Sequence, residues 1–253
     1  MAFRKLLAAG AFLTSTFLFC ASAAQAAPGL DEVVYGATVE PGITEIESRY
    51  GRLTGGPADG EDAFVMELSH GFSSHFYGAA LAIFERTPGD GRKLDAVAFE
   101  GIAPLGRIKP LGLDTALYVE VEKPLHEKAK LESKLLLEKR AGAFDSRLNL
   151  IGEKSIGDGS PIEFRYAASA DYGVGDDLRI GLEAFGDLGT SDRVTSRGEH
   201  FIGPSISTDI EHVGHGEIEL RAGYLFAVGR ARDDTKGQLR FGLAYEFGGD
   251  HDE

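Results

Sequence analysis

The chain has 253 residues with 40 acidic and 26 basic side chains, which gives a formal net charge of -14. This acidic balance argues against a nucleic-acid partner, because proteins bind nucleic acids mainly through Lys and Arg contacts to phosphate. The one cysteine, Cys20, lies in a segment that we expect to be removed. The mature chain therefore has no thiol for a disulfide or a thiolate metal site.

The first 26 residues have the three parts of a secretory signal peptide. Arg4 and Lys5 are basic, residues 6–19 are apolar, and small residues end at Ala26. The apolar stretch is shorter than the roughly 20 residues that a membrane-spanning helix needs. We therefore predict cleavage after Ala26 and secretion across the inner membrane of a bacterium.

Short segments of the remaining chain alternate apolar and polar residues, and this period of two is typical of β-strands. Between Asp62 and Phe72, for example, Phe64 and Leu68 share one face while Glu67 lies on the other. No apolar run after residue 26 approaches the length of a membrane helix, whereas a spanning strand needs only about ten residues. Twelve strands are predicted, at about 43–53, 62–72, 75–86, 94–102, 113–122, 129–139, 143–153, 161–173, 176–188, 199–211, 217–228 and 238–247.

The fold class that these segments predict is all-β, a closed antiparallel transmembrane β-barrel with an even number of strands. An even count is required for a single bacterial chain that returns to its starting side. We expect residues 43–247 to form the barrel as one domain. Residues 27–42 are expected to be a short N-terminal periplasmic segment, and residues 248–253 an acidic C-terminal tail.

Alternation alone does not show which face of the sheet lies inside, because a soluble lipocalin-type barrel buries its apolar face and a membrane barrel exposes it. A two-sheet sandwich also remains open. Two features favour the membrane barrel: the polar face mixes charges of both signs with small residues, and the connections alternate between short and long. The connection at 103–112 does not fit this alternation. Short connections lie at 73–74, near 141 (RAGA) and near 175, and longer ones at 54–61, 86–93, 189–198 and 229–237.

The last predicted strand, LRFGLAYEF from Leu239 to Phe247, resembles the closing strand of bacterial outer-membrane barrels. It departs from that pattern because GGDHDE follows the terminal aromatic residue. Together with GLEAFGDLG at 181–189 and HFIGP at 200–204, the chain resembles small proteobacterial outer-membrane β-barrel proteins of the porin or transporter kind. The resemblance implies a location in the outer membrane, contact with its lipid, and recognition of the last strand by the barrel-assembly machinery.

Some outer-membrane barrels are lipid-modifying hydrolases, which place Ser and His near the membrane boundary. The nearest approach to such a site is the group Ser69, His70, Ser73, Ser74 and His75. His70 falls on the apolar face of its strand, where an amphipathic ring at the interface is ordinary. We therefore predict no catalytic residue and no enzyme, and keep the hydrolase as an alternative.

A second group, Glu211, His212, His215 and Glu217, has the ligand types of a metal site. The Gly-broken sequence EHVGHGE fits a solvated periplasmic turn better. No Gly-rich phosphate loop, dinucleotide fingerprint or zinc signature is present. We expect no metal and no cofactor.

The polar face is the remaining candidate for function. Its charges are either paired with one another or line a wet passage, because a buried charge needs a partner or water. We predict a narrow passive channel for small hydrophilic solutes, with a sealed structural or surface barrel as the alternative. The surface connections are too short for a constriction loop, and residues 27–42 too few for a plug domain. The predicted selectivity residues are Arg49, Glu67, Glu132, Lys134, Arg147, Glu163, Arg165, Arg179, Glu183, Glu219, Arg221, Arg240 and Glu246, on a face that also carries Glu47, Glu120, Glu138 and Glu153.

Overall fold

The computed structural model describes residues 27–157, 159–175, 177–194 and 198–249. The predicted signal peptide, residues 1–26, lies outside the described residues, as do the last four residues of the predicted tail. None of the helices in the described part of the chain is long and apolar enough to cross a membrane.

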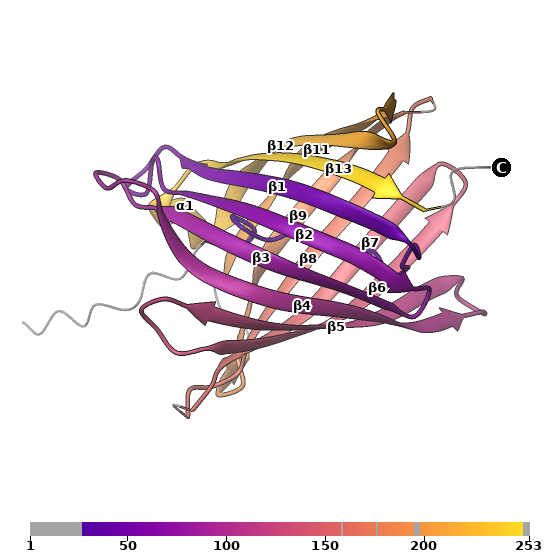
Figure 1. Ribbon diagram of the computed structural model, residues 1–253. Helices are drawn as coiled ribbons and strands as arrows, with labels where there is room; N and C mark the ends of the chain where they lie inside the picture. Colours follow the sequence, from indigo (N-terminus) through magenta and orange to yellow (C-terminus); the bar gives the residue numbers. More distant parts are fainter. Residues whose placement is uncertain (1–26, 158, 176, 195–197, 250–253) are drawn as a thin grey trace, which may run out of the picture.

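The described chain forms one antiparallel sheet that closes on itself (Figure 1). β1 pairs with β2 on one side and with β13 on the other, and β9 pairs with both β8 and β11. These pairings leave no open edge among the long strands, and the predicted barrel is confirmed. The strands are β1 (Ile43–Thr54), β2 (Asp62–Ser73), β3 (Phe76–Arg86), β4 (Lys93–Ile108), β5 (Leu113–Pro124), β6 (Lys130–Ala141), β7 (Phe144–Ser155), β8 (Glu163–Gly173), β9 (Leu178–Thr190), β10 (Arg193–Val194), β11 (Glu199–Val213), β12 (Gly216–Gly229) and β13 (Gly237–Gly248).

The sheet has thirteen strands where twelve were predicted, and the extra one is β10. β10 is two residues long and pairs only with the end of β9, where Arg193 lies opposite Thr190. It forms a short hairpin with the end of β9, whose residues Gly189 and Thr190 also pair with β8. The closed wall is made of the other twelve strands, in the order of the chain.

The connection at 103–112, which did not fit the predicted alternation of loop lengths, is mostly strand. β4 continues to Ile108 through a bulge between Pro104 and Gly106. Gly106 has a positive φ of 110°, which favours glycine at this position. Only residues 109–112 join β4 to β5, so this turn has the same length as 174–177 between β8 and β9 at its end of the barrel.

All the short turns lie at one end of the barrel and all the longer connections at the other. The turn end holds the start of β1 and the end of β13, and the loop end holds α1 (Ala231–Asp234), a single helical turn (Figure 1). This arrangement is typical of membrane barrels, whose periplasmic turns are shorter than their surface loops.

The two faces of the wall differ as a membrane barrel requires. Leu117, Leu135 and Leu150 lie in one cross-strand row on the outer face, each about two-fifths exposed. On the inner face of β6, the strand of Leu135, the side chains of Glu132, Lys134 and Leu136 are buried. The apolar face therefore points outward, as it does in a membrane barrel and as it does not in a lipocalin-type barrel.

The outward face generates a stability prediction at the middle of β6. We expect Leu135→Arg to lower the free energy of unfolding in phospholipid vesicles by about 2–4 kcal/mol, because a lipid-facing charge near the bilayer centre must be desolvated. Denaturant titration of the refolded protein measures this loss. Leu135→Met is the matched control and should change it by less than about 1.5 kcal/mol. An arginine that is tolerated as well as methionine would contradict the outward, lipid-facing placement.

Candidate functional site in the barrel lumen

The lumen contains two cavities, of about 680 Å³ and 280 Å³. The larger cavity reaches toward the turn end, where Asp145, Asp171 and Asp209 line it. The smaller one reaches toward the loop end, along β3 to β8. All thirteen predicted selectivity residues line these cavities: Arg49, Glu67, Arg147, Arg179, Glu183, Glu219, Arg221, Arg240 and Glu246 the larger, and Arg49, Glu132, Lys134, Glu163 and Arg165 the smaller. Their part in selectivity stays a prediction.

Ion pairs join side chains of β1, β2 and β12 on the lumen wall near the larger cavity. The Arg49 guanidinium lies 2.6 Å from a carboxylate oxygen of Glu47 and 2.6 Å from one of Glu67. Arg221 of β12 reaches the other oxygen of Glu47 at 2.5 Å. These side chains are largely removed from water, so each charge needs a partner, which the same strand or another strand supplies.

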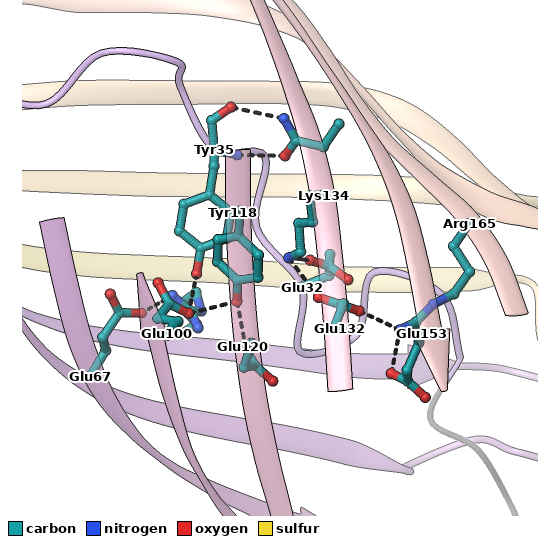
Figure 2. Close-up of polar contacts among 12 residues, drawn as sticks. Glu32, Tyr35, Glu67, Glu100, Tyr118, Glu120, Glu132, Lys134, Glu153 and Arg165 are labelled. Atoms are coloured by element: carbon teal, nitrogen blue, oxygen red, sulfur yellow. Dashed lines mark hydrogen bonds and ion pairs between the residues drawn. The ribbon is translucent and has the colours of Figure 1, made fainter. Parts of the chain in front are cut away.

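A second network lies on the opposite wall, beside the smaller cavity (Figure 2). One nitrogen of Arg165 bridges Glu132 and Glu153, at 2.7 Å from each. Lys134 contacts Glu132 at 3.1 Å and also forms an ion pair with Glu32. Glu32 belongs to the N-terminal segment and not to the wall, so this network ties the segment to the barrel.

Residues 27–42, which we expected to extend outside the barrel as a periplasmic segment, run through its interior. Leu30 packs near the loop end against Leu53 of β1, and the amide of Gly42 donates to the carbonyl of Gly71 at the turn end. The segment thus passes from the loop end to the turn end before the chain reverses into β1. It occupies the lumen as an internal strap, which the prediction of a periplasmic segment did not include.

Side chains of the wall bind the backbone of the strap (residues 27–42) at several points, among them the carbonyl of Pro28, which accepts from Gln238, and that of Glu32, which accepts from Arg240. The Asn149 amide accepts from the Tyr35 amide at 2.8 Å and donates to the Tyr35 carbonyl at 2.9 Å. The Glu138 carboxylate accepts from the amide of Ala37 at 2.8 Å. Asn149 and Glu138 are completely buried. They satisfy backbone groups that would otherwise be unpaired, since the strap has no strand partner.

Tyr35 places its ring among polar wall residues at the centre of the lumen (Figure 2). Its ring centroid lies 5.0 Å from that of Tyr118, and the ammonium of Lys134 lies 4.7 Å and 4.3 Å from the two ring centroids. The Tyr35 hydroxyl donates to Glu100 at 2.9 Å, and the Tyr118 hydroxyl lies 2.7 Å from the same oxygen. Strap and wall are therefore joined by aromatic, cation–π and hydrogen-bond contacts at one place.

Two wall glycines leave room for the strap backbone. A Cβ atom at Gly51 of β1 would overlap with the carbonyl oxygen of Leu30, and one at Gly71 of β2 would overlap with that of Glu40. Glycine permits this close approach because it has no side chain. Apolar contacts add to the fit, since Leu30 and Val34 pack in one buried cluster and Ala37 in another with Tyr118 and Leu136.

Several residues of this site were not among the predicted functional residues, notably Asn149, Glu100 and Tyr118. Each lies on the polar face of a predicted strand, but nothing in the alternation marks it as a contact of the strap. The contact between Tyr35 and Asn149 joins residues 114 positions apart in the chain. The lumen-facing glycines were the available signal, because a strand glycine often marks a close approach of another backbone.

The Ser and His residues considered for catalysis do not form a catalytic pair at Ser69. Ser69 is buried on the inner face of β2, whereas the imidazole of His70 lies on the outer face, 2.9 Å from Thr44 Oγ1 and edge-on to Phe72. In the turn, Ser74 Oγ lies 3.1 Å from Nδ1 of its exposed neighbour His75. Neither arrangement combines an activated hydroxyl with a lumen or membrane pocket.

The groups considered for metal binding are also separated. His212 is exposed and lies 3.6 Å from the carboxylate of Glu211, while Glu217 faces the larger cavity. Among the described residues, one group of three has ligand atoms within 4.8 Å of one another: Glu45, Glu47 and Glu67. Glu47 and Glu67 are already neutralised by Arg49, so this group is part of the ion-pair network.

Comparison with known proteins relates the chain to solved outer-membrane channels by fold. The KdgM porin is 12% identical with a TM-score of 0.52, over 80% of this chain and 98% of that one. The COG4313 outer membrane channel from Pseudomonas putida F1 is 11% identical with a TM-score of 0.57, over 87% and 98%. The NanC porin is 10% identical with a TM-score of 0.55, over 80% and 98%. No family model and no curated protein matches the sequence.

The two hydrogen bonds of Asn149 generate a prediction about the strap. We expect Asn149→Leu to leave the backbone of Tyr35 unpaired, at a cost of about 1–3 kcal/mol per group, and so to speed amide exchange of residues 33–37 at least about tenfold. Hydrogen–deuterium exchange of the protein in detergent micelles measures this rate. Leu150→Ala, on the outer face of the same strand, is the control. Equal exchange in the two variants would contradict the anchoring role of Asn149.

Proposed function

We propose that the chain is a narrow passive channel for small hydrophilic solutes in a bacterial outer membrane. The observation that carries this proposal is the pair of polar cavities inside a barrel whose apolar face points outward. The cavities share the lining residues Glu32, Val33, Tyr35 and Arg49, so they meet beside the strap. A solute would enter one cavity and leave by the other.

The fold shared with the KdgM and NanC porins supports this proposal, because their printed names describe channels. One KdgM structure is described as a complex with disordered oligogalacturonate. At 12% identity that ligand is not carried over, and only the class of small hydrophilic solute enters the proposal. We further propose that the predicted secretion signal and the closing strand deliver the chain to the outer membrane through the assembly machinery.

The strap makes a sealed barrel the second candidate function. It crosses the lumen where Tyr35 and Tyr118 lie side by side, and its backbone is bound by the wall. Such a strap either narrows the passage or closes it. The two cases differ in conductance, so one set of measurements separates them.

Planar-bilayer recording tests the channel directly. The purified mature protein should give discrete current steps that are smaller than those of a general porin recorded in the same salt, because the strap occupies part of the lumen. The refolded Leu135→Arg variant, which should insert poorly into the bilayer, is the control for contaminating channels. If well-inserted protein gives no current steps above background, this result contradicts the open-channel proposal.

Deletion of the strap distinguishes narrowing from closure. Removing residues 28–40 should raise the single-channel conductance at least about twofold, because the obstacle and its contacts leave the lumen. If the complete chain is silent and the deleted chain conducts, the sealed barrel is the native state. An unchanged conductance would contradict the placement of the strap in the passage.

Gly51→Val gives the same test without shortening the chain. The added side chain would overlap with the carbonyl oxygen of Leu30, so the strap must shift while the wall keeps its length. We expect larger current steps or frequent switching between two levels. Gly91→Val, at an exposed glycine of the connection between β3 and β4 with open space around it, is the control for added volume alone.

A further inference from the structure

We propose that the lumen selects cations, and that its physiological solutes are small cationic ones such as amines, cationic amino acids or metal ions. This inference rests on the proposed channel function and adds the class of solute. Twelve acidic and six basic side chains line the larger cavity, and ten acidic and four basic ones line the smaller. Glu32 and Arg49 line both cavities.

The basic side chains of both cavities are already held by carboxylates. Arginine and lysine in the lumen therefore offer little free positive charge to a passing anion, because each is neutralised at ion-pair distance. The pairs are Arg49 with Glu47 and Glu67, Lys130 with Glu122, Lys134 with Glu32 and Glu132, Arg140 and Arg147 with Glu138 and Asp145, Arg165 with Glu132 and Glu153, Arg179 with Asp171, Arg221 with Glu47 and Glu219, and Arg240 with Glu183.

Several carboxylates of the smaller cavity take no part in these ion pairs. Asp31, Glu85, Asp95 and Glu163 line it and form no ion pair with the described residues. They come from the strap, β3, β4 and β8. Asp31 and Asp95 lie near Glu85, whereas Glu163 is on β8, away from these two strands. A solute in this cavity meets negative charge from more than one side.

The turn end of the larger cavity carries a second excess of negative charge. Glu246 of β13 lies directly opposite Glu45 of β1 and Glu217 of β12 in the register of the sheet. All three line the larger cavity. Like charges placed directly opposite each other destabilise a sheet, so this row favours a cation or proton among the three carboxylates.

The excess negative charge of the smaller cavity and that at the turn end of the larger cavity act along the same passage. A lumen with low-dielectric walls focuses the field of its charges, which raises the local concentration of cations and lowers that of anions. Rings of carboxylates select cations in this way in other channels. Since both ends of the lumen have the same sign, an anion meets repulsion at entry and at exit.

The reversal potential of the complete mature protein in a planar bilayer tests this inference. Under a KCl gradient we expect potassium to permeate roughly tenfold more readily than chloride. Current with no preference, or with a preference for chloride, would overturn the cation selectivity while leaving the channel proposal intact. Absence of any current would contradict both proposals.

A triple substitution assigns the selectivity to the unpaired carboxylates. Glu85→Gln, Asp95→Asn and Glu163→Gln together should bring the ratio of potassium to chloride permeability at least about threefold closer to one, because the field inside the cavity weakens. The matched control is Asp90→Asn, Asp192→Asn and Glu211→Gln, which removes the same charge from exposed positions that line neither cavity. An equal effect of the two sets would contradict selection inside the lumen.

Swelling of liposomes that contain the protein extends the test to organic solutes. Free lysine should enter several-fold faster than free glutamate, which has similar size and opposite charge. Entry of glucose shows that the barrel conducts. Glucose entry with equal rates for the two amino acids would overturn the inference.

Discussion

Closure of the sheet between β1 and β13 is the constraint on which the rest of the molecule depends. Lipid offers no hydrogen-bond partner to a strand edge, so every backbone group of the wall has to pair within the sheet. The register between β1 and β13 runs without a break from Ile43 opposite Gly248 to Thr54 opposite Gly237. This closed wall fixes the two faces of every strand. The charged side chains of the polar face must therefore be paired or hydrated inside the lumen.

Charges on that inner face are stabilised by partners on the same strand, on adjacent strands and on strands further round the wall. Arg49, for example, reaches Glu67 on β2 while Arg221 on β12 reaches Glu47. The strap enters the same network through Glu32 and Lys134. Because a buried polar network tolerates few unpaired members, the strap and the wall stabilise each other, and removal of either leaves the other with unsatisfied groups.

Much of this architecture follows from the alternation of residues in the sequence. Alternation predicted the twelve strands of the wall and placed residues such as Arg165 and Glu219 on the inner face, because side chains point to opposite sides of a strand in turn. It predicted neither the continuation of β4 through the bulge at Gly106 nor the position of the strap. A bulge interrupts the alternation of a strand. The strap shows no alternation because it does not belong to the sheet, and distant side chains, Asn149 and Glu138, bind its backbone.

The strap also changes how the lumen charges should be understood. It brings Asp31, Glu32 and Glu40 to the cavity linings and no basic side chain, since residues 27–42 contain neither Lys nor Arg. The element that narrows the lumen therefore makes it more negative as well. The strap therefore contributes both to the narrowness of the lumen and, together with the wall carboxylates, to the proposed cation preference. A wider passage without the strap would have both a weaker field, because water screens it, and fewer carboxylates to produce it.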